Sequence, residues 1–176
     1  GSRKQEIKNH VPVIKEIIVG LKKKINNVFF IIGSLKKENE HLAEKLGLKN
    51  NYKIVDDSFQ AFDESDVAIV ASGTATLECA ITKTPFVVIY KTSFMSWAIT
   101  RLFVKVKFAS IVNILANKLI VREFLQKECQ AQTITNHLIN LINNDKKSLY
   151  SDFEVVINQL GDGVAYKKTA GFLLLK

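Results

Sequence analysis

The sequence predicts an α/β fold, in which a Rossmann-like parallel sheet carries flanking helices and a helical C-terminal tail follows. Short apolar runs of strand length alternate over the first ninety residues with segments of helical periodicity. Such alternation is typical of parallel sheets with helices on both faces. No linker rich in Gly, Pro or Ser interrupts it. We therefore expect one domain over residues 1–176, with an α/β core over about 1–128 and a helical tail over about 129–176.

The predicted elements follow in a regular order up to residue 90. Apolar residues at helical spacing predict a first helix over residues 4–24, and the run VFFII predicts a buried strand over 28–32. A helix over 36–46 is expected to end at Gly47, a residue type common just after helix ends. The remaining elements are a strand over 52–55, a short helix near 59–65, a strand over 66–71, a helix to about residue 81 and a strand over 86–90.

The C-terminal part is predicted to contain few strands. Residues 110–115 are expected to form a short strand or extended segment. Helices are predicted over residues 122–127, 133–143, 146–160 and about 164–175. This tail is expected to wrap back over the sheet or to dock on another domain.

The pattern begins with a helix that has no strand ahead of it. Gly1-Ser2-Arg3 has the composition of a turn between a strand and a helix, although Gly-Ser is also a common cloning remnant. A parallel sheet that begins with its helix is expected to lack one strand at or near its middle.

Composition narrows the class of protein. An apolar fraction of 47% and a charged fraction of 24% fit a packed globular domain and exclude a disordered chain. Two cysteines without CxxC spacing argue against a disulfide framework or a zinc module. No apolar run approaches the roughly 20 residues of a membrane-spanning helix. The net charge of +8 admits nucleic acid, anionic lipid or a phosphorylated small molecule as partner.

The segment DVAIVASGTATLE, residues 66–78, is the most informative. An apolar strand leads into Ser72-Gly73-Thr74, and Ser72 or Thr74 is placed to cap the helix that follows. The N–H groups of such a helix start suit a phosphate or diphosphate, and Gly73 allows a ligand to approach the backbone closely. Glu78, one turn later, is placed to accept hydrogen bonds from ribose hydroxyls. The alternative is an ordinary βα turn followed by a solvated glutamate.

Two further features point to anionic partners. Arg3 lies where the helix dipole disfavours a cation, which a grip on a diphosphate would explain; an exposed Arg at a chain end is the alternative. Residues 94–107 interleave aromatic and basic side chains, as in a helix on an anionic membrane surface; a core helix with a basic edge is the alternative. The candidate membrane-contact residues are Phe94, Met95, Trp97, Arg101, Leu102, Phe103 and Lys105.

Other chemistries find little support. The absence of a Walker A or GxGxxG pattern argues against an NTPase or a dinucleotide oxidoreductase. The three histidines are far apart without metal-ligand spacing, and Cys79 is expected in the core. We expect no metal, no cofactor and no nucleic-acid partner.

Several motifs together resemble a known family. GSRKQEI at residues 1–7, SGTATLE at 72–78, PFVVIY at 85–90, and NILA at 113–116 followed by EFLQ at 123–126 occur in the order found in the C-terminal half of lipid-A-disaccharide synthase. That enzyme is an inverting glycosyltransferase of the GT-B fold. The resemblance covers nearly the whole chain.

The resemblance implies a function and a set of site residues. The family transfers 2,3-diacylglucosamine from its UDP derivative, UDP-2,3-diacylglucosamine, to lipid X (2,3-diacylglucosamine 1-phosphate). By this resemblance Arg3 would contact the donor diphosphate, Ser72, Gly73 and Thr74 would place a helix start at the phosphates, and Glu78 would hold the ribose. Asn113 would line the donor site.

The resemblance also implies a location. Residues 94–103 would meet the inner membrane of a Gram-negative bacterium from the cytoplasmic side. The acceptor domain with the catalytic acidic residue is expected in a missing N-terminal half, so the isolated chain is expected to be inactive and to need that half or a second copy.

The chain departs from the family pattern in one loop. Val112 replaces a proline, and Asn117-Lys118-Leu119 replaces Gly-Arg-Glu. Two alternatives therefore stay open. One is a non-catalytic remnant or membrane-surface binding module. The other is a different GT-B sugar-nucleotide transferase, such as the muramyl-pathway N-acetylglucosaminyltransferase.

Overall fold

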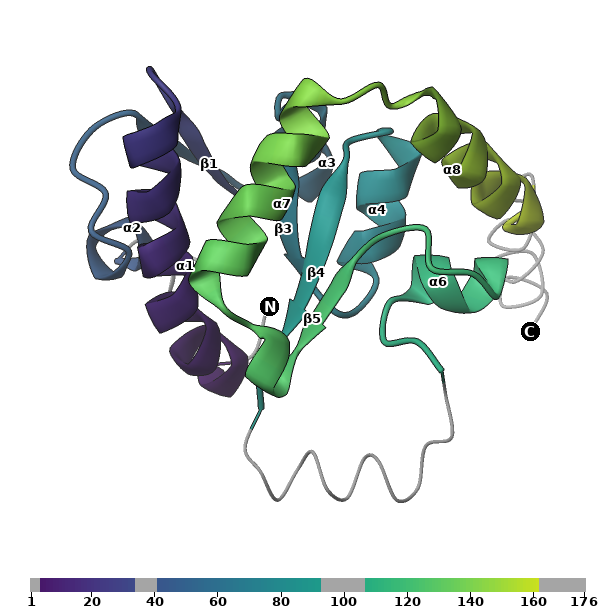
Figure 1. Cartoon of the computed structure of the whole chain (residues 1–176), viewed down its shortest axis with the longest axis horizontal. Helices are drawn as coiled ribbons and strands as arrows, with labels where there is room; N and C mark the ends of the chain where they lie inside the picture. The colour runs from purple at the N-terminus through teal and green to yellow at the C-terminus, as the bar shows by residue number, and fades with distance from the viewer. Residues whose placement is uncertain (1–3, 34–40, 93–106, 162–176) are drawn as a thin grey trace, which may run out of the picture.

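The computed structural model describes residues 4–33, 41–92 and 107–161, and it contains two parallel sheets between layers of helices (Figure 1). β1 (Phe30–Gly33) pairs with β2 (Tyr52–Val55). The second sheet has the order β3 (Ala68–Ala71), β4 (Phe86–Tyr90), β5 (Glu123–Leu125). All these pairings are parallel, which confirms the predicted α/β fold class.

Helices cover both faces of the three-stranded sheet. α1 and α7 pack against each other and against β4 on one face, while α4, α6 and α8 pack together on the other (Figure 1). The helices are α1 (Lys4–Lys24), α2 (Leu42–Lys45), α3 (Ser58–Asp63), α4 (Ala75–Ile81), α6 (Ile111–Ala116), α7 (Ala131–Asn143) and α8 (Lys147–Gln159), with a 3-10 turn over Gln126–Glu128.

β4 forms the centre of the core because it is apolar on both faces. Val87 and Ile89 pack against α1 and α7, whereas Phe86 and Val88 pack toward α4, α6 and α8. All four side chains are at most 1% exposed. The Phe86 ring stacks on that of Phe153 from α8, with 5.7 Å between the ring centroids. A continuous apolar run is what a strand buried on both faces requires.

Most predicted elements are confirmed within the described residues. α1, α7 and α8 differ from the predicted helices by two residues or fewer at each end, and β2 and the strand at residues 86–90 agree fully. Gly47 ends α2 as predicted, with a φ of 74°. Its N–H donates to the Glu44 carbonyl and that of Leu48 to the Ala43 carbonyl, both at 2.9 Å, the bond pattern of a Schellman motif. Residues 36–40 of the helix predicted over 36–46, and the helix predicted near 164–175, lie outside the described residues.

Residues 110–115 are helical, so the predicted extended segment is wrong. Ser110 is the N-cap of α6, and its Oγ accepts a hydrogen bond from the Asn113 N–H at 3.1 Å. The β-branched pair Ile111-Val112 favoured a strand, but the serine cap and the complete burial of Val112 stabilise a helix instead.

The helix predicted over residues 122–127 is also wrong, because Glu123–Leu125 form β5 and a 3-10 turn begins at Gln126. β5 pairs with β4 in the register Val88↔Glu123 to Tyr90↔Leu125. The local pattern of charged and apolar residues is compatible with a helix, but pairing with a buried strand outweighs this local preference.

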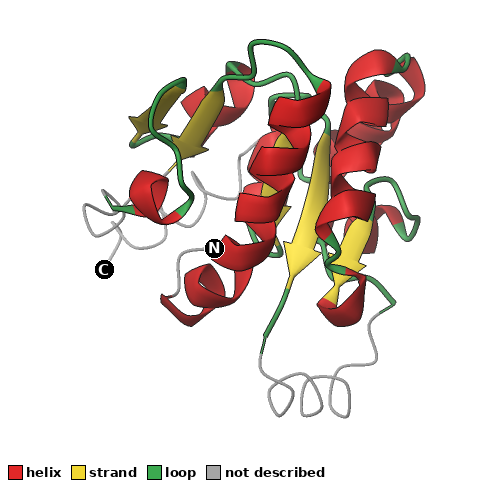
Figure 2. Cartoon of the chain, turned by 60° about the vertical axis from the view of Figure 1, so that its left-hand side comes forward, coloured by secondary structure: helices red, strands yellow, loops and turns green. Residues whose placement is uncertain are grey.

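A break between β1 and β3 separates the two sheets, and no strand of the described residues bridges it. β1 and β3 are both edge strands, and Figure 2 shows the two sheets as separate groups of arrows. Two helices, α1 and α3, each lie against both β1 and β3. On α1, Ile14 packs against the core cluster that holds Phe30 of β1 and against the one that holds Ile69 of β3. On α3, Ala61 lies close to β1 while Phe62 packs against the cluster that includes β3.

Candidate functional site

The candidate site lies at the carboxyl end of β3, where the order of the strands reverses. From β1 the chain continues outward to β2, then crosses back through α3 to β3 and continues outward to β4 and β5. In open α/β sheets, ligands bind outside the carboxyl ends of the strands at such a reversal. The Ser72-Gly73-Thr74 turn follows β3 directly at this point.

Gly73 gives the turn an open backbone. Its φ is 147°, and a Cβ built on it would meet no atom within 4 Å. Among the described residues, no acceptor is recorded for the N–H groups of Gly73 and Thr74, whereas the Thr76 Oγ1 donates to the Gly73 carbonyl at 2.8 Å. The turn therefore presents backbone donors on a surface that a ligand can approach closely.

Neither predicted cap residue caps α4. Thr74 occupies the N-cap position with helical φ and ψ and makes no side-chain capping bond. The Ser72 Oγ instead donates to the Ala109 carbonyl at 2.6 Å. The capping prediction is wrong because the hydroxyl of Ser72 is used to join the end of β3 to the segment that precedes α6.

Glu78 faces α3, the helix that follows β2. Its Oε2 accepts a hydrogen bond from the Ser58 Oγ at 2.5 Å, and the carboxylate stays partly exposed. Ser58 is the first residue of α3, after the N-cap Asp57, whose carboxylate accepts from the Phe59 N–H at 2.9 Å. The structure thus adds Ser58 to the candidate site. The pair Asp57-Ser58, shortly after the end of β2, was the available sequence signal for a helix start.

Asn113 is completely buried, and its amide has a partner at every position. The Nδ2 donates to the Val121 carbonyl and to Glu123 Oε1, both at 2.8 Å. The Oδ1 accepts from the N–H groups of Ile120 and Val121, at 2.8 and 3.0 Å. A side-chain amide offers two donors and two acceptor sites, so Asn113 is saturated within the protein.

Glu123, which sequence reasoning missed as a functional residue, completes this network. The carboxylate is in a residue only 8% exposed and accepts from the N–H groups of Ala109 and Ser110 and from Asn113, each at 2.8 Å. Because Ala109 also accepts from Ser72, a continuous chain of hydrogen bonds runs from the end of β3 to β5. We call these four residues, Ser72, Ser110, Asn113 and Glu123, the polar network.

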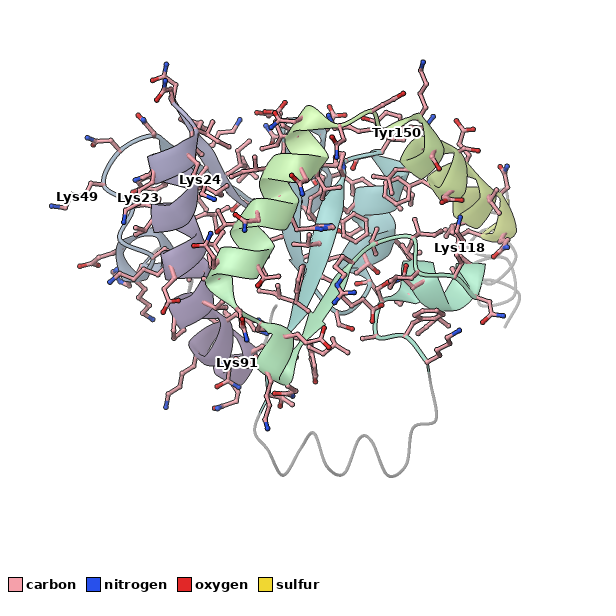
Figure 3. The ribbon with its side chains drawn as sticks, in the orientation of Figure 1. Lys23, Lys24, Lys49, Lys91, Lys118 and Tyr150 are labelled. Atoms are coloured by element: carbon pink, nitrogen blue, oxygen red, sulfur yellow. The ribbon has the colours of Figure 1, made fainter. Side chains whose placement is uncertain are left out.

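The basic residues of the described chain are spread around the molecule (Figure 3). Lys23, Lys24 and Lys49 lie at the end of α1 and just before β2, at the amino edge of the strands. Lys91 follows β4 at the carboxyl edge, and the Lys118 Nζ lies 2.9 and 3.0 Å from the carboxylate oxygens of Asp152. Within the described segments, the basic residues are therefore not concentrated at the candidate site.

The other predicted site residues lie outside the described residues. These are Arg3 and the seven membrane-contact residues from Phe94 to Lys105. In the described segments no helix is both long and apolar enough to cross a membrane. No cluster of three potential metal ligands is found among the described side chains.

Both cysteines and His10 are buried, whereas His137 is only partly buried. Cys79 is 0% exposed and Cys129 7% exposed, and burial raises the pKa of both thiols. Burial also lowers the pKa of His10 to about 4, with a further contribution from neighbouring positive charge including Lys91. The pKa of His137 is lowered by burial and by Arg122.

Comparison with known proteins gives one consistent family. Residues 1–173 match the protein family described as lipid-A-disaccharide synthetase. The lipid-A-disaccharide synthase of Rickettsia conorii is 36% identical over 165 residues, which cover 92% of this chain and 37% of the relative. Lipid-A-disaccharide synthase 1 of Legionella pneumophila strain Lens is 34% identical over 163 residues, 91% of this chain and 41% of the relative. The chain thus spans about two fifths of the length of these curated relatives.

Proposed function

Because this chain belongs to the lipid-A-disaccharide synthase family, we propose that it is the C-terminal, donor-binding part of a GT-B glycosyltransferase of lipid A biosynthesis. The substrates would be UDP-2,3-diacylglucosamine as donor and lipid X as acceptor. The turn after β3 carries this proposal, because Gly73 is open and lies at the reversal of strand order, and the N–H groups of Gly73 and Thr74 meet no acceptor among the described residues.

The residues of the turn have separate roles in this proposal. The N–H groups of Gly73 and Thr74 bind the diphosphate, with Arg3 as a charged partner for the same group. Glu78 accepts hydrogen bonds from the ribose hydroxyls. Its bond to the Ser58 hydroxyl holds the carboxylate toward α3, so that Ser58 orients the group that recognises the ribose.

The donor-site residues act on the leaving group. The 6-hydroxyl of lipid X attacks the anomeric carbon of the donor and gives its proton to the acidic residue expected in the N-terminal half. The bond from that carbon to the diphosphate oxygen breaks, and UDP leaves with the electron pair. Backbone N–H groups and the guanidinium of Arg3 stabilise the negative charge that develops on the diphosphate. Positioned donors of this kind contribute without rearrangement at the moment of reaction.

Asn113 and Glu123 serve this site as positioning residues. Asn113 is saturated and fully buried, so a direct bond to the donor would require breaking one of its four internal bonds. The polar network instead holds the segment before α6, whose Ala109 carbonyl accepts from Ser72. In this way the network fixes the turn that would bind the diphosphate.

UDP titration by calorimetry tests the donor site. Binding is the appropriate measurement because the chain spans only about two fifths of its relatives. We expect saturable binding of UDP by the wild-type chain and at least a tenfold weaker affinity for Glu78→Ala, roughly 1.4 kcal/mol. Glu154→Ala is the matched control, since Glu154 is exposed on α8 and pairs only with Lys83 among the described residues. A folded wild-type chain that binds no UDP at millimolar concentration would favour the non-catalytic remnant.

We also propose a peripheral position on the cytoplasmic face of the inner membrane. The support is the aromatic and basic composition of residues 94–105, which suits an anionic lipid surface. Co-sedimentation with vesicles containing anionic phospholipid should decrease when Trp97→Ser and Phe103→Ser are combined. Undiminished sedimentation of that double variant would assign membrane contact elsewhere.

A further inference from the structure

We propose that the amino edge of the two-stranded sheet carries a second binding site, which accepts a phosphorylated sugar. A cavity of about 660 Å³ lies there, between the end of α1, the turn into β1 and the loop into β2. Its volume is in the usual range for small-ligand pockets. The strands of this sheet begin at the cavity, whereas the Ser72-Gly73-Thr74 turn follows the end of β3. We call it the amino-edge cavity.

Internal hydrogen bonds hold the walls of the amino-edge cavity in place. The Phe30 N–H donates to the Asn51 carbonyl at 2.8 Å, which joins the start of β1 to the loop before β2. In the same loop Leu48 is only 5% exposed, and its N–H donates to the Ala43 carbonyl at 2.9 Å. The cavity is therefore formed in the absence of a ligand, which lowers the entropic cost of binding.

Two pairs of asparagines supply polar groups to the cavity. Asn26 and Asn27 come from the turn after α1, and Asn50 and Asn51 come from the loop before β2. All four are exposed, and their side chains make no hydrogen bond within the described part of the chain. Asn27 and Asn51 have φ values of 57° and 60°, a left-handed conformation in which asparagine is common. Asn26 and Asn50 have no such conformational reason, and their amides are available to a ligand.

Three lysines bring positive charge to the same place. Lys22 and Lys49 line the cavity, and the Lys15 Cε lies 3.5 Å from a Cβ built on Gly47, which also lines it. The Lys22 Nζ lies 5.6 Å from the centroid of the Phe30 ring. No ion pair joins these lysines to another described residue, and no carboxylate is among the described side chains that line the cavity. Ammonium groups without a paired carboxylate attract an anion such as phosphate.

This combination of groups specifies a sugar that carries a phosphate. A side-chain amide both donates and accepts hydrogen bonds, as sugar hydroxyls do, so four amides suit a molecule with several hydroxyls. Ile25 and Val28 are partly buried and give the cavity an apolar side, on which the C–H face of a sugar ring can pack. The lysines suit the phosphate. A simple anion would use the lysines and leave the amides without a role.

NMR titration of the isotope-labelled 176-residue chain tests the proposal, with glucose 1-phosphate, glucose and inorganic phosphate as separate probes. We expect glucose 1-phosphate to shift the amide signals of Asn50 and to bind about tenfold more tightly than either other probe. Lys22→Gln combined with Lys49→Gln should weaken its binding about tenfold. The matched control, Lys83→Gln combined with Lys147→Gln, removes the same charge from exposed lysines outside the cavity and should weaken it less than about twofold.

A second pair of substitutions separates sugar recognition from charge attraction. Asn26→Ala combined with Asn50→Ala should weaken the binding of glucose 1-phosphate and leave that of inorganic phosphate unchanged. Glu78→Ala, in the turn region after β3, should change neither.

Four outcomes would overturn the proposal. Equal affinity of the wild-type chain for glucose 1-phosphate and inorganic phosphate would show that the sugar is not recognised. An equal loss of binding in both pairs of lysine variants would show general attraction of anions to a basic protein. Loss of binding in Glu78→Ala would assign the ligand to the candidate site after β3. A folded chain whose spectrum none of the three probes alters would show that the cavity takes no phosphorylated sugar.

Discussion

The two sheets use similar sequences but achieve different burial. The run VFFII leads into β1, and FVVIY forms β4. In β4 the first four side chains are at most 1% exposed. In the β1 region, Phe29 is 55% exposed and every residue of β1 keeps some accessible surface.

The difference lies in the neighbours and not in the runs themselves. β4 has a paired strand on each side and helical layers above and below it. β1 has a paired strand on one side only. The hydrophobicity of a strand thus indicates how much of its surface could be buried. The neighbouring strands and helices determine how much of it is buried.

The largest expected effect comes from replacing one aromatic residue in each of the two sheet regions. Phe86→Ala removes a ring that stacks on Phe153 in the core, and it should lower the free energy of unfolding by about 3–5 kcal/mol. Phe29→Ala removes a mostly exposed ring and should cost less than about 1 kcal/mol. Urea unfolding of both variants measures this contrast. Equal losses would mean that the β1 region is as well packed as β4.

The next effect concerns the polar network. Glu123→Ala leaves the N–H groups of Ala109 and Ser110 and the amide of Asn113 without their acceptor, which should cost about 3 kcal/mol. Glu128→Ala, at an exposed pair with Arg122, should stay within about 0.5 kcal/mol. Denaturant unfolding measures both. A folded Glu123→Ala protein should also bind UDP more weakly, and unchanged UDP affinity would remove its positioning role.

A smaller effect depends on pH and acts through α1, which packs on both sheets. His10 is 3% exposed, and its pKa of about 4 lies below the usual 6.5. Between these two pKa values, His10 is protonated in the unfolded chain but not in the folded chain. The contribution of the neutral His10 to the free energy of unfolding is therefore fully present above pH 6.5 and is lost as the pH falls toward 4. The loss by pH 4.5 should be about 2 kcal/mol. Unfolding curves of the wild type and of His10→Gln, recorded above pH 6.5 and at pH 4.5, test this. The substitution should reduce the change in the free energy of unfolding between the two pH values.

The smallest expected effect concerns an exposed ion pair on the part of the molecule that contains the three-stranded sheet. Lys83 and Glu154 form an exposed ion pair with an Nζ to Oε1 distance of 2.7 Å. Lys83→Ala should change the free energy of unfolding by no more than about 0.5 kcal/mol. Thermal unfolding at low and high salt measures it. A loss above 1 kcal/mol that disappears at high salt would show that this pair contributes as much as a buried contact.

The fold was more predictable than the chemistry of individual side chains. Strands and long helices depend on the spacing of apolar residues, which is local, so β4, α7 and α8 were predicted close to their observed bounds. β5 was not, because its partner β4 lies more than thirty residues away in the sequence. Within the candidate site, the turn at Ser72-Gly73-Thr74 was predictable from its composition, whereas the use of the Ser72 hydroxyl on Ala109 was not.

The sequence by itself determined the alternation of strands and helices and the turn after β3. These depend on periodicity and on the backbone preferences of residues such as Gly73, which act over a few positions. Only the tertiary structure decided that Asn113 is saturated, that Glu123 is buried, and that Ser58 meets Glu78. Hydrogen-bond partners and burial depend on segments that meet only after folding, because a buried polar group takes whichever partner the packed chain brings within reach.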